Sequence, residues 1–320
     1  MRIERAAIDN QRSVGPQPTI RNRESLRYLH LDVFTSRPFE GNQLAVFPEP
    51  GDLPAETLQA IAKEMAFSET TFIYPAEKGG DVKMRIFTPG EELPMAGHPT
   101  IGSTFALAAE GTIVRGREQF VFELGVGPTP VSLEWDARGL SFAWMTQPLP
   151  TFGPTIVDRA PLAAAIGLED TSLAPDRPAQ VVSCGVPFLF VPLTTRAAVD
   201  AVAFDRRAMV RCCAAAGTGE LPVFFFTTEG PETVYSRMLA PGFGVAEDPA
   251  TGGASGPLGA YLLRHRVVSP EEAREMVSLQ GVAMGRPSRI HIAIDGEPDR
   301  ITRVRVGGRS VLVGRGELMI

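Results

Sequence analysis

Two glycine-rich corners of the sequence could bind an anion. His98 follows Gly97 in the segment MAGHPTIG, and Asp248 stands shortly before Gly252 and Gly253 in the segment EDPATGG. Each segment opens onto a run of small and apolar residues that predicts a helix. A helix begins with unpaired N–H groups and a partial positive charge, which together attract an anion. Two such corners facing each other would bind a carboxylate or an enolate.

Glu69, in the segment SETTF, could supply acid–base chemistry. It lies between a segment with helical periodicity and an apolar, strand-like run. A carboxylate at such a junction is more often solvated, and each glycine-rich corner could simply shape a tight turn into a helix. Burial against the strand would instead raise the pKa of Glu69 and suit it to moving protons near neutral pH. The presence of two corners with different ionisable residues favours function.

The two corners belong to a repeat within the chain. The stretch RIFTPGEELPMAGHPTIG recurs as RMLAPGFGVAEDPATGG, with arginine, proline and glycine at matching places, and the match extends upstream through residues 72–85 and 224–237. A shift of two residues then aligns His98 with Asp248. The sequence therefore predicts two copies of one structural unit that face each other.

The segments around the repeat predict an α+β fold. Two helical runs, residues 99–109 and 254–263, are small and apolar on nearly every side, and a helix without a polar face must be surrounded by protein. Strand-like runs separated by polar or glycine turns precede and follow each of them. We therefore expect each half to form a curled, mostly antiparallel, barrel-like sheet around one central helix.

The domain organisation follows from the repeat and from local composition. Residues 1–27 are polar, rich in arginine and without periodicity, which predicts a flexible N-terminal extension. We expect an N-terminal domain over residues 28–148 and a C-terminal domain over residues 149–320, with the terminal strands able to cross between them. The proline-rich segment 147–155 is the expected linker.

The composition restricts the classes of partner. The chain has 320 residues, a net charge of −6 and a sequence pI of about 5.4. Nucleic acids and anionic membranes call for a basic surface, so neither is an expected partner. The sequence has no apolar run of the roughly 20 residues that a membrane span needs, and no signal-peptide pattern. These features predict a cytoplasmic protein whose partner is a small molecule or another protein.

The cysteines and the remaining glycine motif exclude other chemistry. Cys184, Cys212 and Cys213 are too few and too irregular for a disulfide framework, and no zinc-ligand spacing is present, so no metal is expected. The segment GGASGPLG has neither the spacing of a serine nucleophile elbow nor that of a dinucleotide-binding loop, and no buried strand precedes it.

Three motifs in this order, SETTF, RIFTPGEELPMAGHPTIG and EDPATGGASGPLGAYL, together with the later GRPSRI, resemble those of the phenazine-biosynthesis isomerase family, the PhzF-like proteins. The resemblance covers residues 28–320. It implies the diaminopimelate-epimerase-like fold, in which two domains related by a pseudo-two-fold axis enclose the active site in the cleft between them. It further implies that Glu69 is the general acid/base and that His98 and Asp248 share in catalysis. Members of the family use no cofactor and are often dimeric, so no cofactor and a homodimer are expected.

One position departs from the family pattern. The family often has a substrate-binding serine two residues after the threonine of the DPATG motif, where this chain has Gly253. Ser255, further along, could supply the hydroxyl group instead. The candidate substrate contacts are therefore Gly97, Gly102, Gly252, Gly253 and Ser255.

We therefore predict a cofactor-independent isomerase that moves a proton between carbons of a small carboxylate-bearing molecule. Glu69 would remove and return the proton, His98 and Asp248 would bind and polarise the substrate, and the two helix starts would stabilise the developing negative charge. One alternative is a two-base epimerase on the same fold, which would need a thiol at each corner. Another is a non-catalytic module for metabolite binding or protein interaction that kept the cleft.

Overall fold

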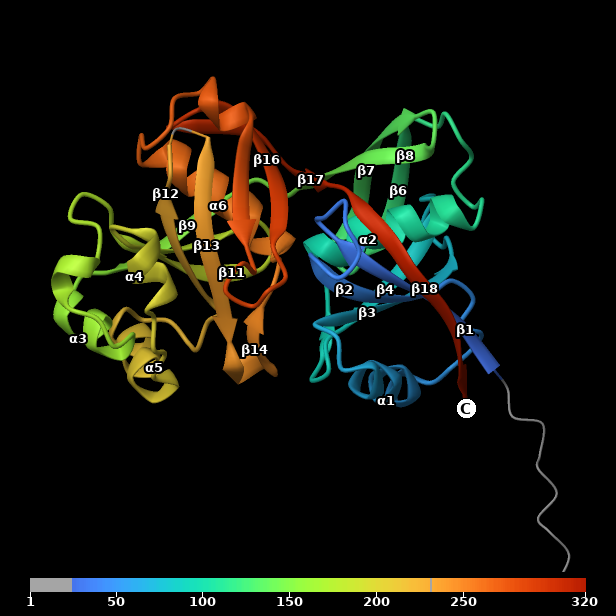
Figure 1. Cartoon of the computed structure of the whole chain (residues 1–320), viewed down its shortest axis with the longest axis horizontal. Helices are drawn as coiled ribbons and strands as arrows, with labels where there is room; N and C mark the ends of the chain where they lie inside the picture. The colour runs from blue at the N-terminus through green and yellow to red at the C-terminus, as the bar shows by residue number, and fades with distance from the viewer. Residues whose placement is uncertain (1–24, 231) are drawn as a thin grey trace, which may run out of the picture.

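The structure, a computed structural model, describes residues 25–230 and 232–320 of the chain. Residues 1–24, most of the expected extension, lie outside the described residues, and residues 25–27 belong to the first strand. Figure 1 shows two lobes, each built of strands around one helix. None of the described helices is long and apolar enough to cross a membrane.

The elements follow a similar order in both halves, with additional helices in the second. The first half contains β1 (Ser25–Val33), β2 (Asn42–Phe47), α1 (Ala55–Met65), β3 (Glu69–Pro75), β4 (Val82–Phe87), β5 (Glu92–Leu93), α2 (Gly97–Ala109), β6 (Gln119–Leu124), β7 (Gly127–Asp136), β8 (Gly139–Gln147) and β9 (Thr151–Ile156). The second half contains α3 (Arg159–Ala165), η1 (Asp170–Ser172), β10 (Ala179–Ser183), β11 (Pro187–Pro192), α4 (Arg196–Asp200), α5 (Arg206–Ala215), β12 (Val223–Thr228), β13 (Thr233–Ala240), η2 (Pro241–Phe243), β14 (Val245–Asp248), α6 (Gly252–Arg264), η3 (Glu272–Arg274), β15 (Met276–Gln280), β16 (Ser288–Glu297), β17 (Arg300–Gly308) and β18 (Ser310–Met319).

The strand pairings confirm the repeat. Strand β2 is antiparallel to β1 and parallel to β3, β4 is antiparallel to β3 and parallel to β6, and β6, β7 and β8 continue antiparallel. Strands β10, β11, β12, β13, β15, β16 and β17 pair in the same order and with the same directions. Helix α2 connects β5 to β6, and α6 connects β14 to β15, so the central helices occupy equivalent places. The predicted two similar halves, each mostly antiparallel, are therefore correct.

The two halves exchange their last strands. The C-terminal strand β18 pairs with β1, and β9 pairs with β10, while β8 and β17 pair with each other between the lobes. We call β1–β8 with β18 the N-lobe and β9–β17 the C-lobe. Figure 1 shows β18 crossing the N-lobe, where the chain also ends. Because β9 and β18 each pair along one side, the curled sheet stays open.

The segment expected to be a linker is mostly strand. Residues 147–155 lie in β8 and β9 except for residues 148–150. Pro154 fits into β9 because β9 is an edge strand and its register with β10 shifts between the partners Gln180 and Val182. An edge position or a bulge is where a strand tolerates the missing N–H of proline.

Each central helix is buried by its own lobe. Helix α2 contributes Ile101, Ala106 and Leu107 to the N-lobe core, and α6 contributes Leu258 and Tyr261, among others, to the C-lobe core. Both helices begin two residues earlier than predicted, at Gly97 and Gly252. The glycine-rich corners are therefore the first turns of the helices themselves.

Candidate active site

The N-termini of the two central helices touch. A Cβ atom placed on Gly97 would lie 2.6 Å from Cα of Gly252, and one placed on Gly252 would lie 3.0 Å from Cα of Gly97. Real Cβ atoms essentially never come as close as 2.6 Å, and 3.0 Å is tighter than most of their contacts, so glycine allows the two backbones to touch here. The predicted meeting of the two corners is confirmed.

Glu69 comes to this junction from the start of β3, where it pairs with Leu44 of β2. Its side chain is 15% exposed, and Oε2 lies 3.2 Å from Nδ1 of His98, whose side chain is 2% exposed. No described residue donates a hydrogen bond to this oxygen. Burial, and then the nearby charge of Asp248, raise the pKa of Glu69 well above its usual range. The carboxyl group is therefore held with a strong affinity for a proton.

His98, the second residue of α2, is a neutral imidazole. Burial lowers its pKa to about 3, although a contact of 3.3 Å between Nε2 and the carbonyl oxygen of Gln43 opposes this shift. When Nε2 carries the proton, it donates a hydrogen bond to the carbonyl oxygen of Gln43, and Nδ1 is then an acceptor. Protonated Glu69 can donate to that acceptor. The two opposite pKa shifts place the shared proton on Glu69.

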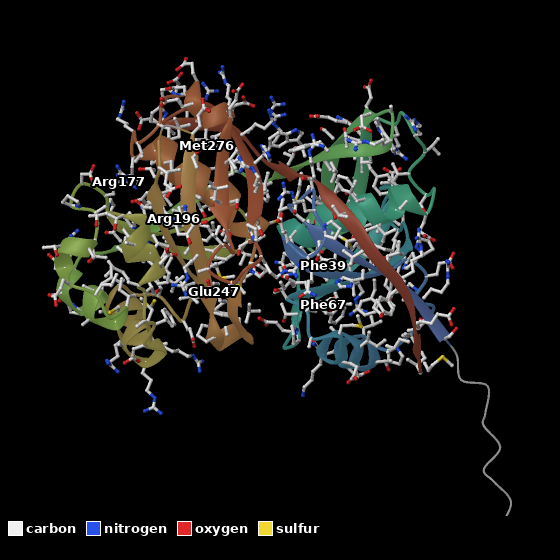
Figure 2. All side chains as sticks on the ribbon, in the orientation of Figure 1. Phe39, Phe67, Arg177, Arg196, Glu247 and Met276 are labelled. Atoms are coloured by element: carbon white, nitrogen blue, oxygen red, sulfur yellow. The ribbon has the colours of Figure 1, made fainter. Side chains whose placement is uncertain are left out.

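Asp248 ends β14 and faces the same junction from the C-lobe. Its Oδ1 accepts hydrogen bonds from Nδ2 of Asn42 at 2.7 Å and from Oγ of Ser68 at 2.8 Å, and its Oδ2 accepts one from Oγ1 of Thr251 at 2.6 Å. Burial raises the pKa of Asp248 to about 6, and these hydrogen bonds oppose the shift. Asp248 is therefore ionised at neutral pH. Figure 2 shows its neighbour Glu247 in the C-lobe and Phe67, shortly before Glu69, in the N-lobe.

Asn42 links the two ionisable corners, and sequence reasoning missed it. Its amide nitrogen donates to Asp248 and, at 3.0 Å, to the carbonyl oxygen of Ala250, and it lies 3.3 Å from Nδ1 of His98. Since an amide NH₂ group has two protons, the first two contacts use both, and Nδ1 remains available to Glu69. A polar residue at the start of the apolar strand LAVF was the available signal.

Three more positioning residues were also missed. Gln280, at the end of β15, donates to the Asp248 carbonyl oxygen at 2.8 Å and to Thr251 Oγ1 at 2.9 Å, and it accepts from the Thr251 N–H. Ser68 precedes Glu69 directly, and Thr251 belongs to the DPATG motif, so their places beside known candidates were the signal. Gln280 stands in an ordinary strand pattern, which contains no such signal.

Two predicted substrate contacts, Gly102 and Ser255, make close contacts within the protein. A Cβ atom on Gly102 would lie 2.6 Å from Cγ2 of Val33, so this glycine lets α2 approach β1. Oγ of Ser255 is buried and donates to the carbonyl oxygen of Thr251 at 2.9 Å, one turn earlier in α6.

The site is closed and contains no thiol. Asp248 is 4% exposed, and cavities of 360, 530 and 390 Å³ elsewhere in the molecule are lined by neither Glu69, His98 nor Asp248. Within residues 25–230 and 232–320, no cluster of three or more His, Cys, Asp or Glu side chains could hold a metal ion. Cysteine is present at neither corner.

Solved structures share this architecture. A Bacillus anthracis phenazine biosynthesis protein of the PhzF family superposes with a TM-score of 0.80 at 24% identity, covering 93% of this chain and all of that chain. A hydroxyproline epimerase from Agrobacterium vitis superposes with a TM-score of 0.66 at 14% identity, covering 92% of this chain and 93% of that one. The fold is therefore that of the two-lobed isomerases and epimerases, as predicted.

Sequence comparison identifies the family within this class. The family model of phenazine biosynthesis-like proteins, PhzC-PhzF, matches residues 31–316. A Pseudomonas aeruginosa protein named trans-2,3-dihydro-3-hydroxyanthranilate isomerase is 37% identical over 290 residues, which is 91% of this chain and 98% of that protein. The chain belongs to the phenazine biosynthesis-like family, and it is an isomerase.

Proposed function

We propose that this isomerase moves a proton between two carbons of a small unsaturated carboxylate, with Glu69 removing the proton and returning it. The contact of 3.2 Å between Oε2 of Glu69 and Nδ1 of His98, buried where the two helices meet, is the observation that carries the proposal. The P. aeruginosa relative is named for trans-2,3-dihydro-3-hydroxyanthranilate, which belongs to this chemical class. We take that compound as the first substrate to test.

Burial makes Glu69 an effective base. Burial raises the pKa of its carboxyl group well above its usual range, so the carboxylate has a strong affinity for a proton. The carboxylate then takes a proton from carbon, and the electron pair of the broken C–H bond spreads through the conjugated system towards the substrate carboxylate. The same carboxyl group returns the proton to another carbon of that system. The atoms and charges balance without a further reagent.

The other groups at the junction hold the substrate and its charge. Backbone N–H groups at the starts of α2 and α6 face the developing negative charge, and His98 holds Glu69 in position. Oδ2 of Asp248 accepts one hydrogen bond from within the protein, so it retains a lone pair for a hydroxyl or amino group of the substrate. The cytoplasmic location and the homodimer stay predictions.

Proton exchange with heavy water tests the proposal. The enzyme is incubated in D₂O with trans-2,3-dihydro-3-hydroxyanthranilate and with a panel of small unsaturated carboxylates, and the substrate carbons are followed by proton NMR. Conversion with deuterium incorporated at carbon supports the proposal. A ligand that raises the melting temperature without conversion or exchange, with no acid in the panel turned over, would instead indicate a binding module.

A further inference from the structure

The repeat places an arginine at the same position of both lobes. Arg85 lies in β4 and Arg237 lies in the equivalent strand β13, and each binds a glutamate of the short strand that follows. Nε and Nη2 of Arg237 donate to the two carboxylate oxygens of Glu247 in β14, both at 2.8 Å. The same nitrogens of Arg85 donate to Glu92 in β5, both at 2.7 Å. In each lobe the arginine therefore holds the short strand that leads into the central helix.

The ion pair of the C-lobe is the more enclosed of the two. The side chains of Arg237 and Glu247 are 13% and 19% exposed, whereas those of Arg85 and Glu92 are 24% and 43% exposed. A bidentate pair shielded from water holds both partners in a defined geometry, while a more exposed pair contributes less. We therefore expect the two arginines to differ in importance.

Arg237 also binds helix α4. Its Nη1 donates to the carbonyl oxygens of Val199 at 3.1 Å and of Asp200 at 3.0 Å, at the end of this helix. Arg85 donates to no carbonyl oxygen of the described residues. Arg237 thus connects β14 to an element on the other side of its own strand, and the guanidinium group is fixed from two directions.

The strand that Arg237 holds contains Asp248. Strand β14 has four residues, and Asp248 is the last of them, directly after Glu247. Its pairing with β13 shifts register within this short length, so the backbone ladder alone holds it weakly. In the N-lobe, by contrast, Glu92 stands well before His98, which lies in helix α2 itself. Only in the C-lobe does the ion pair lie next to an ionisable residue of the site.

We infer that Arg237 is a positioning residue of the active site, which acts through Glu247 to hold Asp248 at the junction of the two central helices. The inference rests on the proposed function and adds a residue that acts on the site from outside it. Asn42 and Ser68 bind the Asp248 carboxylate from the N-lobe, and the ion pair holds its backbone from the C-lobe.

The ion pair also determines which charges act on Asp248. Glu247 is a like charge beside it and contributes to raising its pKa, and Arg237 balances that charge in the intact pair. The other ionisable groups at the junction are Glu69 from β3 and His98 from α2, and neither is altered by changes in the pair. Removal of Arg237 should therefore raise the pKa of Asp248, and removal of the charge on Glu247 should lower it.

NMR titration of Asp248 tests this role without turnover. The carboxyl carbon is followed in protein containing isotope-labelled aspartate, and Asp248→Asn identifies its signal. Arg237→Met should raise the pKa of Asp248 by about 0.5 or more, and Glu247→Gln should lower it by about as much. Arg85→Met, the matched change in the N-lobe, should leave this pKa within about 0.2 of the wild-type value.

Steady-state kinetics adds a test of position. Arg237→Met should lower kcat/KM for the proposed reaction about tenfold or more, whereas Arg85→Met should change it within about twofold. Arg237→Lys keeps the positive charge but cannot make the bidentate contact, so it should keep the pKa of Asp248 and still lower kcat/KM. Circular dichroism checks that each variant is folded.

Two results would overturn the inference. One is a pKa of Asp248 that moves in the same direction, or does not move, in Arg237→Met and Glu247→Gln. The other is an equal loss of kcat/KM in Arg237→Met and Arg85→Met. If Arg237→Met does not fold, Glu247→Gln and Arg237→Lys decide the same two questions. Because the titration needs no turnover, its result is distinct from a failure of the isomerase assay.

Discussion

Nδ1 of His98 lies 3.2 Å from Oε2 of Glu69, with both side chains almost enclosed by protein. Burial acts on the two groups in opposite directions, since it lowers the pKa of the imidazole to about 3 and raises the pKa of the carboxyl group. The proton between them therefore resides on Glu69. This relationship supports the proposal that Glu69 transfers the proton at carbon, with His98 as its positioning partner.

Asn42→Ala should shift the pH dependence of catalysis. The Asn42 amide stabilises the ionised form of Asp248, so its removal should raise the pKa of Asp248 above about 6. We assign the acid limb of the kcat/KM profile to the ionisation of Asp248, so this limb should move to higher pH. Ser68→Ala removes the other donor to the same oxygen and should move the limb in the same direction. A lower kcat with an unmoved acid limb would contradict the assignment of this limb to Asp248.

Asp248 should make the folded protein less stable as pH rises. Its pKa is raised from 3.8 to about 6 on folding, so the stabilisation is complete below pH 3.8 and is lost as pH rises through 6. The shift corresponds to roughly 3 kcal/mol, and Glu69 contributes in the same direction. Urea unfolding at pH 4 and pH 7 should therefore show the wild type losing stability relative to Asp248→Asn. An unchanged difference between the two proteins would show that the Asp248 pKa is not raised.

Arg286→Met should loosen the connection between the lobes. From the β15–β16 turn, Arg286 contacts buried Asp32 at 2.5 Å and donates to the carbonyl oxygens of Glu40 and Gly41, next to Asn42. The change leaves Asp32 as an unpaired buried charge, which typically costs about 3–5 kcal/mol.

Urea unfolding measures this loss of stability. The kcat of the folded variant should also fall, because Arg286 no longer holds the backbone next to Asn42. Arg37→Met, which removes an exposed pair with Glu40 at 3.9 Å, is the control and should change the stability by less than about 1 kcal/mol. Equal stabilities of the two variants would refute the role of Arg286.

Thiol reagents should leave the activity intact. All three cysteines are buried, and burial raises the pKa of each thiol, that of Cys184 to about 12. Little reactive thiolate is therefore present near pH 7. Iodoacetamide treatment should be followed by mass spectrometry, activity and circular dichroism. Activity lost in step with one modification, in a protein that stays folded, would revive the two-base thiol epimerase.

The repeat and the three motifs made the fold and the meeting of Glu69, His98 and Asp248 predictable, because local spacing reveals helix starts and internal similarity reveals their relation. The supporting hydrogen bonds were not predictable. Asn42 and Asp248 are 206 positions apart, and no feature of the sequence near either residue indicates that they form a hydrogen bond. Gly102 and Ser255 stay predictions as substrate contacts, and the structure shows that glycine and serine near a corner also serve packing and the helix backbone. The sequence allowed for terminal strands that cross between the halves, but the pairing of β18 with β1 joins the two ends of the chain and has no local signal.

Conversion by Glu69→Gln in D₂O, compared with the wild type, tests the role of Glu69 most directly. Glutamine keeps the shape of the side chain, and no described donor loses a partner at Oε2, so the variant should fold normally. It cannot accept a proton, and general acid–base catalysis is worth roughly a hundred- to ten-thousand-fold in rate. Glu91→Gln, in an exposed turn, is the control. We predict that the wild type and the control convert the substrate and, where the proton on Glu69 exchanges with D₂O before its return, place deuterium on carbon, while folded Glu69→Gln neither converts nor labels the substrate. Near-normal turnover by Glu69→Gln would contradict the role assigned to Glu69 and make His98 or Asp248 the base.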